Sequence, residues 1–199
     1  MALRSLFATR LYEAELGDEE LLADLAHSIR SLAKDDAAGR RWSRQHRYAG
    51  YTSYASLSDL SKRDPAFADL ARILVRHSAK FARECAFDVA HKPRIDSLWV
   101  NLMKGSGHHA GHIHPNSIIS GTLYVEAPEK SGSIRFEDPR LPLMMAAPPR
   151  RRDAPGDLQP FITVQPRPGL LLLWESWLRH EVLAGSGRQE RLSVSFNLA

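Results

Sequence analysis

Apolar residues in the first half of the chain recur at helical spacing. One stripe follows three acidic residues, which suit the positive end of a helix dipole, and it predicts a helix over residues 18–34. A second helix is expected to begin at Asp64 and Pro65, which are typical N-cap and first-turn residues, and to end before Pro93. Residues 35–63 show no clear period and are interpreted as irregular. The stripes consist of Leu21, Leu22, Leu25, Ile29 and Leu32, and of Phe67, Leu70, Ile73, Leu74, Phe81 and Cys85.

Beyond residue 95 the pattern changes to short runs of β-branched, leucine and aromatic residues between glycine and proline turns. Several short strands separated by turns are typical of an all-β sandwich or barrel. We therefore expect a single domain over 1–199, in which a helical support and irregular segment (1–94) carries a β-roll core (95–199). The expected strands span 97–103, 117–125, 133–136, 161–164, 170–174, 181–183 and 191–197.

One long connection interrupts the expected core. The insert 138–160 contains six prolines, three consecutive arginines and two adjacent methionines. A connection of this length is often a functional lid. We expect this insert and the segment 40–48 to border the mouth of a pocket.

The composition is that of an ordinary globular protein, with 43% hydrophobic and 25% charged residues in 199. A single cysteine, Cys85, excludes an internal disulfide and a multi-cysteine metal site, and it fits a reducing compartment. No apolar stretch approaches the roughly 18 residues that a membrane span needs, and the start of the chain lacks the apolar core of a signal peptide. These features predict a cytoplasmic protein with no membrane partner.

The formal net charge of +4 is a mild basic excess, and two arginine clusters carry much of it. The clusters are either solvated loop charge or a means of attracting an acidic substrate. A nucleic-acid partner is disfavoured because no recognised binding module surrounds them. The clusters consist of Arg40, Arg41, Arg44 and Arg47, and of Arg150, Arg151 and Arg152.

The candidate chemistry lies in the histidines of the second half. Four of the nine histidines fall within 108–114, and His112 and His114 precede a strongly predicted strand. Residues two apart on a strand point to the same face, so this pair can reach one metal ion together. His180 follows a buried run of leucines and offers a third imidazole from a distant part of the chain. Lone histidines are interpreted as satisfied surface or core residues: His27, His46, His77 and His91.

The last predicted strand places Arg191 and Ser193 on its more polar face, in alternation with apolar residues. A guanidinium inside a barrel is costly to bury without a partner, and a carboxylate ligand would supply one. Asn101 lies between two apolar residues and is hard to explain as core unless it is paired. Tyr124 is either a core aromatic or a hydrogen-bonding group near the histidines.

These residues carry a resemblance to a known family. Two segments, together with SLFATRLYEAEL and GYTSYASL, resemble the 2-oxoglutarate/Fe(II)-dependent oxygenase family, in the branch marked by HxHP, SG and a final RxSxSFN strand. The likeness spans nearly the whole chain. The two segments are WVNLMKGSGHHAGHIHPNSIISGTLYVEAPEKSGSIRFEDPR and PRPGLLLLWESWLRHEVLAGSGRQERLSVSFNLA.

The resemblance implies a mainly β fold, a double-stranded β-helix or jelly-roll core supported by N-terminal helices. It implies that Fe(II) is bound by His112, His114 and His180. Most of the superfamily has a carboxylate where this chain has His114, and a His₂-carboxylate set leaves positions open for oxygen and co-substrate. Asn116, a water molecule or a carboxylate from elsewhere, with Asp138 as the best candidate, are alternatives for that ligand.

The resemblance also implies that Arg191 and Ser193 hold the distal carboxylate of the co-substrate 2-oxoglutarate, with Asn101 and Tyr124 beside it or beside the substrate. The implied reaction couples oxidative decarboxylation of 2-oxoglutarate to hydroxylation of a substrate C–H bond. That substrate is a small molecule or a protein side chain, with an acidic character favoured by the charge. The sequence leaves a homodimer open.

Two other functions remain in competition at the level of sequence. A cupin-like metal-dependent enzyme also has an HxH pair, but its usual glutamate is missing from the stretch after His114, and Arg191 would have no role. A non-catalytic module that binds metal or ligand is favoured by the missing carboxylate ligand. Release of succinate from 2-oxoglutarate distinguishes an oxygenase from both.

Overall fold

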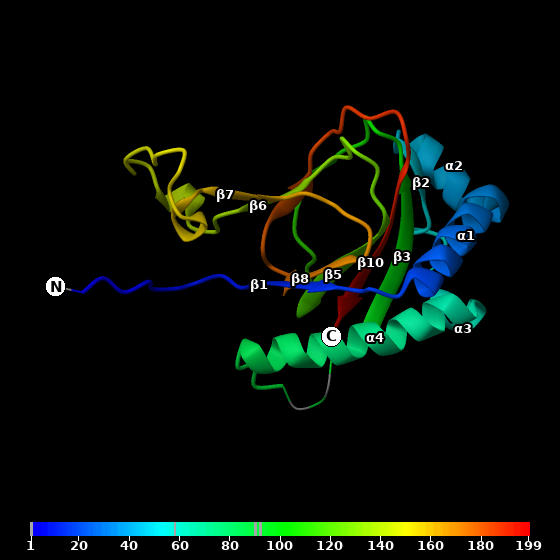
Figure 1. Ribbon diagram of the computed structural model, residues 1–199, viewed down its shortest axis with the longest axis horizontal. Coiled ribbons are helices and arrows are strands. Elements are labelled where there is room, and N and C mark those ends of the chain that lie inside the picture. The colour runs from blue at the N-terminus through cyan, green and yellow to red at the C-terminus, as the bar shows by residue number, and fades with distance from the viewer. Residues whose placement is uncertain (1, 58, 90, 92) are drawn as a thin grey trace.

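The computed structural model describes residues 2–57, 59–89, 91 and 93–199. Its centre is a pair of antiparallel sheets that face each other (Figure 1). The larger sheet has the order β1-β8-β5-β10-β3-β2 and the smaller one β4-β9-β6-β7. The larger sheet comprises β1 (Leu11–Glu15), β8 (Leu170–Glu175), β5 (Ile119–Glu126), β10 (Arg191–Leu198), β3 (Ile95–Met103) and β2 (Gly50–Thr52). The smaller sheet comprises β4 (His109–His112), β9 (His180–Val182), β6 (Ile134–Glu137) and β7 (Phe161–Val164).

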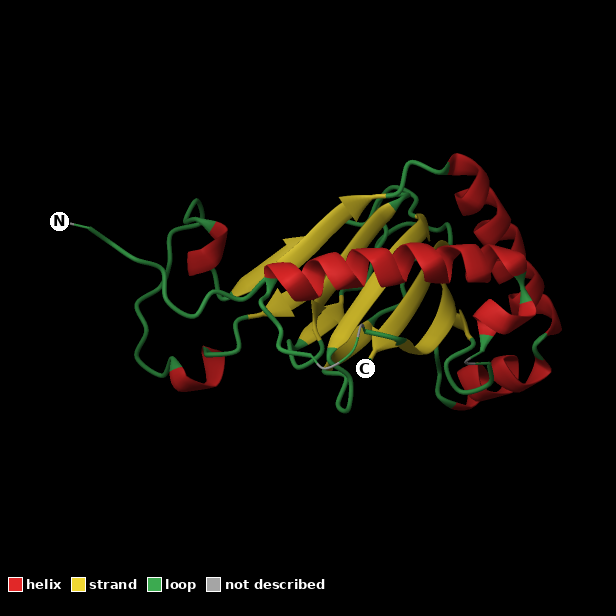
Figure 2. Ribbon diagram, turned by 90° about the horizontal axis from the view of Figure 1, so that it is seen from below, coloured by secondary structure: helices red, strands yellow, loops and turns green. Residues whose placement is uncertain are grey.

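Two long helices cover the outer face of the larger sheet. Figure 2 shows α4 (Pro65–Glu84) lying across the strands, and α1 (Glu19–Asp35) packs beside it. The side chain of Asp18 caps α1 by accepting from the Leu21 amide, and Asp64 caps α4 in the same way. The two helices expected from the apolar stripes are therefore present close to their predicted bounds. Among the described residues, no helix combines the length and the apolar character needed to cross a membrane.

Strand alternation separates a helix-facing core from an inner chamber. In β10, Leu192, Val194 and Phe196 pack into the core beneath the helices and are fully buried. Arg191 and Ser193 point the other way, between the two sheets, as the two-residue period requires. The inner face therefore carries the polar groups, and the mainly β architecture predicted from the sequence is confirmed.

The segment 35–63, which the sequence analysis treats as irregular, contains three short elements. They are α2 (Ala37–Gln45), β2 and α3 (Leu60–Arg63). Asp36 ends α1 and caps α2 with its side chain, so one acidic residue divides two helices that the apolar pattern does not separate. β1 and β2 join the larger sheet from the first half of the chain, so that half supplies edge strands as well as helices.

The insert 138–160 leaves the smaller sheet between β6 and β7 and projects beside the extended N-terminal arm (Figure 1). It contains two short 3₁₀ helices, η1 (Leu141–Leu143) and η2 (Gly156–Leu158). The hydroxyl of Ser5 donates to the carboxylate of Asp157 at 3.4 Å, which joins the arm to the insert. Both segments lie on the side of the molecule away from α2.

Candidate metal centre

Three imidazoles converge at the inner face of the smaller sheet. His112, the last residue of β4, and His180, the first of β9, are Cα partners in the antiparallel pair. His114 completes the set, and the ligand nitrogens of the three residues lie within 4.8 Å of one another. A group of this kind could hold one metal ion. The structure thus brings together the three histidines that the sequence selects.

The reason for this convergence differs from the one expected. β4 ends at His112, so His114 is not its neighbour on one face of a strand. Instead the His114 amide donates to the Ser176 carbonyl at 3.0 Å, in the turn before β9. The ring of His114 is then stacked on that of His180, with centroids 5.2 Å apart. A turn between two strands, rather than strand alternation, aims this third imidazole.

Backbone carbonyls set the tautomers of two of the rings. Nδ1 of His112 lies 2.8 Å from the Ala110 carbonyl oxygen, and Nδ1 of His180 lies 2.9 Å from that of Leu178. A carbonyl oxygen only accepts, so each Nδ1 carries the proton and donates it. Each Nε2 therefore has its lone pair free for a metal ion, which is the usual outer-shell arrangement for histidine ligands.

Burial keeps two imidazoles of the site, His114 and His180, neutral. It lowers the pKa of His180 to about 3 and that of His114 to about 4, and the neighbouring imidazoles add to the effect. Metal ions bind the neutral ring, so these side chains need not lose a proton at pH 7. Within the described residues the cluster contains no carboxylate. The donor set is nitrogen only, which suits Fe, Zn, Cu and Ni.

The alternative ligands lie outside the cluster. Asn116 is exposed in a left-handed turn conformation with a φ of 73°. The carboxylate of Asp138 is paired with the guanidinium of Arg140 at 2.7 Å. Asp138 does not belong to the group of converging ligand atoms, and Asn116 is not among the described residues that line the chamber. Of the histidine and carboxylate candidates, His114 alone joins His112 and His180.

The inner chamber also contains a buried arginine that has no carboxylate partner among the described residues. Arg191 is 5% exposed and donates from Nη1 to the Gly132 carbonyl at 2.7 Å. Its Nη2 faces the Met103 sulfur at 3.3 Å, its Nε has no partner in the described part of the chain, and its guanidinium lies over the Tyr124 ring. A buried cation in this state is costly unless an anion joins it. The site therefore fits an anionic ligand between Arg191 and the imidazoles.

The remaining predicted residues line the same chamber. Ser193 and Tyr124 face it from β10 and β5, and burial raises the pKa of Tyr124 to about 12. Asn101 is held by the protein itself: its Oδ1 accepts from Tyr48 at 3.2 Å and from Thr52 at 2.9 Å. Its Nδ2 donates to Ser195 at 3.1 Å, which leaves one amide hydrogen for a ligand.

The sequence-based site lacks several residues in or beside the chamber, among them Tyr48, Trp99 and His109. Tyr48 follows α2 and packs behind two chamber residues, His109 and Asn101, where burial raises its pKa above the usual value for tyrosine. Trp99 lines the chamber beside His114, with ring centroids 6.0 Å apart. His109 lies in the histidine-rich run, but its spacing of three from His112 predicts opposite faces of a regular strand. The run of four histidines was the only sequence signal for it.

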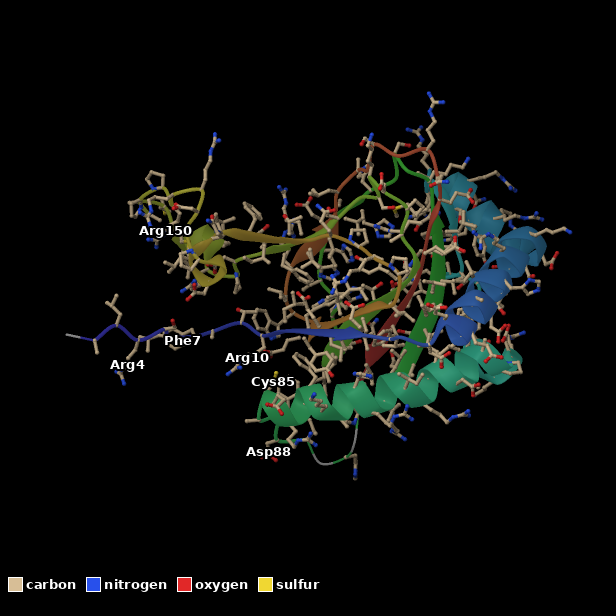
Figure 3. The ribbon with its side chains drawn as sticks, in the orientation of Figure 1. Arg4, Phe7, Arg10, Cys85, Asp88 and Arg150 are labelled. Atoms are coloured by element: carbon tan, nitrogen blue, oxygen red, sulfur yellow. The ribbon has the colours of Figure 1, made fainter. Side chains whose placement is uncertain are left out.

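The arginine clusters lie away from the chamber. Arg40 and Arg44 line a separate groove beside β2, with Lys34 and Lys104. Figure 3 shows Arg150 on the projecting insert. None of the described residues that line the chamber comes from the insert 138–160, so its expected role as a lid stays a prediction.

A comparison with protein families identifies the chain. Residues 97–197 match the model of a family described as "Putative 2OG-Fe(II) oxygenase". The protein belongs to this family of 2OG-Fe(II) oxygenases. The oxygenase is therefore an enzyme whose family uses Fe(II) and 2-oxoglutarate, as the resemblance predicted. Its place in the HxHP branch of the family stays a prediction.

Solved structures show the same fold as this oxygenase. The α-ketoglutarate-dependent epimerase SnoN of nogalamycin biosynthesis aligns with a TM-score of 0.65 and 18% identity, over 96% of this chain and 78% of SnoN. A prolyl-4-hydroxylase from Pseudomonas putida aligns with a TM-score of 0.61 and 14% identity, over 96% and 92% of the two chains. HygX from Streptomyces hygroscopicus, with nickel and 2-oxoglutarate bound, aligns with a TM-score of 0.58 and 15% identity, over 96% and 82%.

The fold is thus the double-stranded β-helix of these oxygenases, as predicted. No curated protein sequence matches the chain.

Proposed function

We propose that the oxygenase hydroxylates its substrate with Fe(II) held by His112, His114 and His180. Arg191 and Ser193 would bind the distal carboxylate of 2-oxoglutarate. One observation carries the proposal: three converging imidazoles face the same chamber as a buried arginine that has no carboxylate partner among the described residues. The first group suits a metal ion and the second suits a dianion, and 2-oxoglutarate would connect the two.

Bound iron would supply the oxidative chemistry, while the chain supplies ligands, orientation and exclusion of water. The Nδ1 donations of His112 and His180 to backbone carbonyls hold both rings in place before a metal arrives. Three neutral imidazoles leave the net charge of the metal site more positive than a His₂-carboxylate set does. Such a site favours an anionic chelator, and the keto-acid end of 2-oxoglutarate is one.

Arg191 would position the co-substrate from its far end. Its guanidinium is fixed by the Gly132 carbonyl and by the Tyr124 ring, so little side-chain freedom is lost when a carboxylate binds. Ser193 lies on the same face of β10 and would add a hydroxyl donor. Asn101 has one free amide hydrogen and, with Tyr124, would contact the co-substrate or the substrate.

The class of substrate is supported by fewer observations than the metal and co-substrate sites are. The neighbours SnoN and prolyl-4-hydroxylase are named for an epimerisation and a prolyl hydroxylation, so the shared fold accommodates different reactions. We keep a small molecule or a protein side chain as the substrate, with an acidic character favoured by the formal net charge of +4. A cytoplasmic location and a homodimer stay predictions.

We also propose that residues 1–199 form one domain. The proposal is supported by β1 and β2, which pair with β8 and β3 and so join the first half of the chain to the second.

Anaerobic titration tests the proposed function. Addition of Fe(II) and then 2-oxoglutarate is expected to give a weak visible charge-transfer band that saturates at one equivalent of each. With oxygen and no substrate, slow formation of succinate is expected. Iron bound without the band would contradict chelation of the co-substrate, and a band without succinate would indicate the non-catalytic module.

A further inference from the structure

A β-bulge turns a fourth histidine into the chamber. In the β4–β9 pair, His109 is opposite Val182 and His112 is opposite His180, with a register shift between them. Three steps along β4 therefore match two steps along β9, so one residue of β4 is extra. In a regular strand, a spacing of three residues would place His109 and His112 on opposite faces. The extra residue returns the His109 side chain to the face of His112, and both histidines line the same chamber.

The bulge also places His109 at the level of the arginine. Residues 180 and 182 of β9 are separated by about 6.6 Å along the strand. His180 marks the metal level, and the next residue after Val182, Leu183, is hydrogen-bonded to the loop that contains Gly132. The Gly132 carbonyl is the acceptor for Arg191. His109 and the Arg191 guanidinium therefore lie farther along the chamber than His180. Their separation from the histidine cluster is about the length of a five-carbon diacid.

The His109 ring is supported on one side and free at its nitrogens. Its centroid lies 5.2 Å from that of Tyr48, whose hydroxyl donates to Asn101 at 3.2 Å. The Tyr48 ring is thus fixed by its own hydrogen bond and supports the imidazole. Within the part of the chain that the structure describes, neither nitrogen of His109 has a hydrogen-bond partner. A ligand in the chamber can therefore accept from it.

We propose that His109 donates a hydrogen bond to the distal carboxylate of 2-oxoglutarate, beside Arg191. The inference rests on the proposed function and adds a specificity-determining residue to the same site. A carboxylate has more acceptor positions than one bidentate arginine uses, so both donors can bind it at once. The second donor selects a five-carbon dicarboxylate over monocarboxylic keto acids.

Two keto acids test the proposal on Fe(II)-loaded protein without oxygen. 2-Oxoglutarate and 2-oxobutyrate share the chelating end, but the second has no distal carboxylate. The dissociation constant of each is measured from its charge-transfer band. In His109→Phe, which keeps an aromatic ring against Tyr48, the constant for 2-oxoglutarate is expected to rise about tenfold. The constant for 2-oxobutyrate is expected to change by less than about twofold.

Matched variants separate hydrogen bonding from packing. His109→Asn and His109→Gln place an amide donor near the two ring nitrogens in turn, and one of them is expected to recover most of the lost affinity. His108→Phe makes the same change at the exposed neighbour and should leave both constants unaltered. If His109→Phe does not fold, His109→Leu serves the same comparison.

Two results would overturn the inference. One is an unchanged constant for 2-oxoglutarate in His109→Phe, and the other is an equal loss for both keto acids in that variant. The proposed function fails separately, because in that case the wild-type protein itself gives no band with 2-oxoglutarate.

Discussion

His112 and His180 face each other across the β4–β9 pair, with ring centroids 4.5 Å apart and each Nδ1 donating to the carbonyl two residues earlier. The same contact, from Nδ1 to the carbonyl two residues earlier, therefore sets the tautomer of both rings. Because the acceptors are backbone atoms, they depend on strand geometry rather than on a further side chain. The two imidazoles are oriented by the fold itself.

Substitution of His114 tests the third ligand. His114→Ala removes one of three donors and is expected to weaken Fe(II) affinity at least about a hundredfold, since even outer-shell changes cost 10–100-fold. His114→Asp restores a His₂-carboxylate set and is expected to keep iron binding. Metal affinity is measured by competition with a chromophoric chelator. Unchanged affinity in His114→Ala, with His108→Ala as the control, would exclude this residue as a ligand.

Replacement of Arg191 should separate binding from stability. Arg191→Met fills a similar volume without the buried charge, so the unfolding free energy of the ligand-free protein is expected to stay unchanged or rise by about 1 kcal/mol. Affinity for 2-oxoglutarate is expected to fall by about a hundredfold, since truncating one partner of a buried charge pair costs several kcal/mol.

Urea unfolding and calorimetric titration measure the two effects of Arg191→Met. Clear destabilisation with unaltered co-substrate affinity would show that Arg191 has a structural role alone.

The pH dependence of stability follows from the buried imidazoles. The pKa of His180 is lowered to about 3 and those of His114 and His109 to about 4, from an ordinary value near 6.5. The unfolded chain therefore binds more protons at acidic pH, and stability present above about pH 6.5 is lost progressively as the pH falls toward 4. Calorimetry of the metal-free protein is expected to show a lower Tm at pH 5 than at pH 7.

The variant His180→Asn provides the control for this pH effect. It removes the group with the lowest pKa, so its Tm should fall less between pH 7 and pH 5 than that of the wild type. Equal falls in the two proteins would contradict the assignment.

Gly132→Ala tests the support of Arg191. A Cβ at this position would lie 1.9 Å from the Leu183 carbonyl oxygen, so the loop must move. We expect a loss of about 1–3 kcal/mol in unfolding free energy and several-fold weaker binding of 2-oxoglutarate, because the Gly132 carbonyl that holds Arg191 is displaced. At the control Gly156→Ala the nearest atom lies at 3.4 Å, and neither quantity should change. If Gly132→Ala is destabilised but binds 2-oxoglutarate as tightly as the wild type, the Gly132 loop is not needed to position Arg191.

The sequence predicts those parts of the fold in which the local pattern of apolar residues matches the buried positions. The cap at Asp64, the helix start near Asp18 and the alternation around Val194 appear in the structure as predicted. β2 was missed because three residues carry no readable period, and α2 because its start depends on one shared cap, Asp36. Short elements that are stabilised by long-range pairing leave little local signal.

The candidate site likewise contains residues that the sequence indicates and residues that only the three-dimensional pairing reveals. The sequence selects His112, His114, His180 and Arg191, and the structure brings them into one chamber, because ligand residue types are rare enough to stand out. Histidine spacing could not indicate His109, since its orientation depends on a bulge defined only by pairing with β9. Tyr48, which packs against His109 and donates to Asn101, comes from a segment that is remote in the sequence.

The hydrogen bonds from Tyr48 and Thr52 to Asn101 have a consequence for engineering. The region matched by the family, 97–197, contains every proposed iron ligand, yet two groups that hold its amide in place come from outside it. A transplanted fragment of that region would expose Asn101 to solvent and open one wall of the chamber. Redesign of this oxygenase therefore has to keep the stretch between α2 and β2 together with the roll.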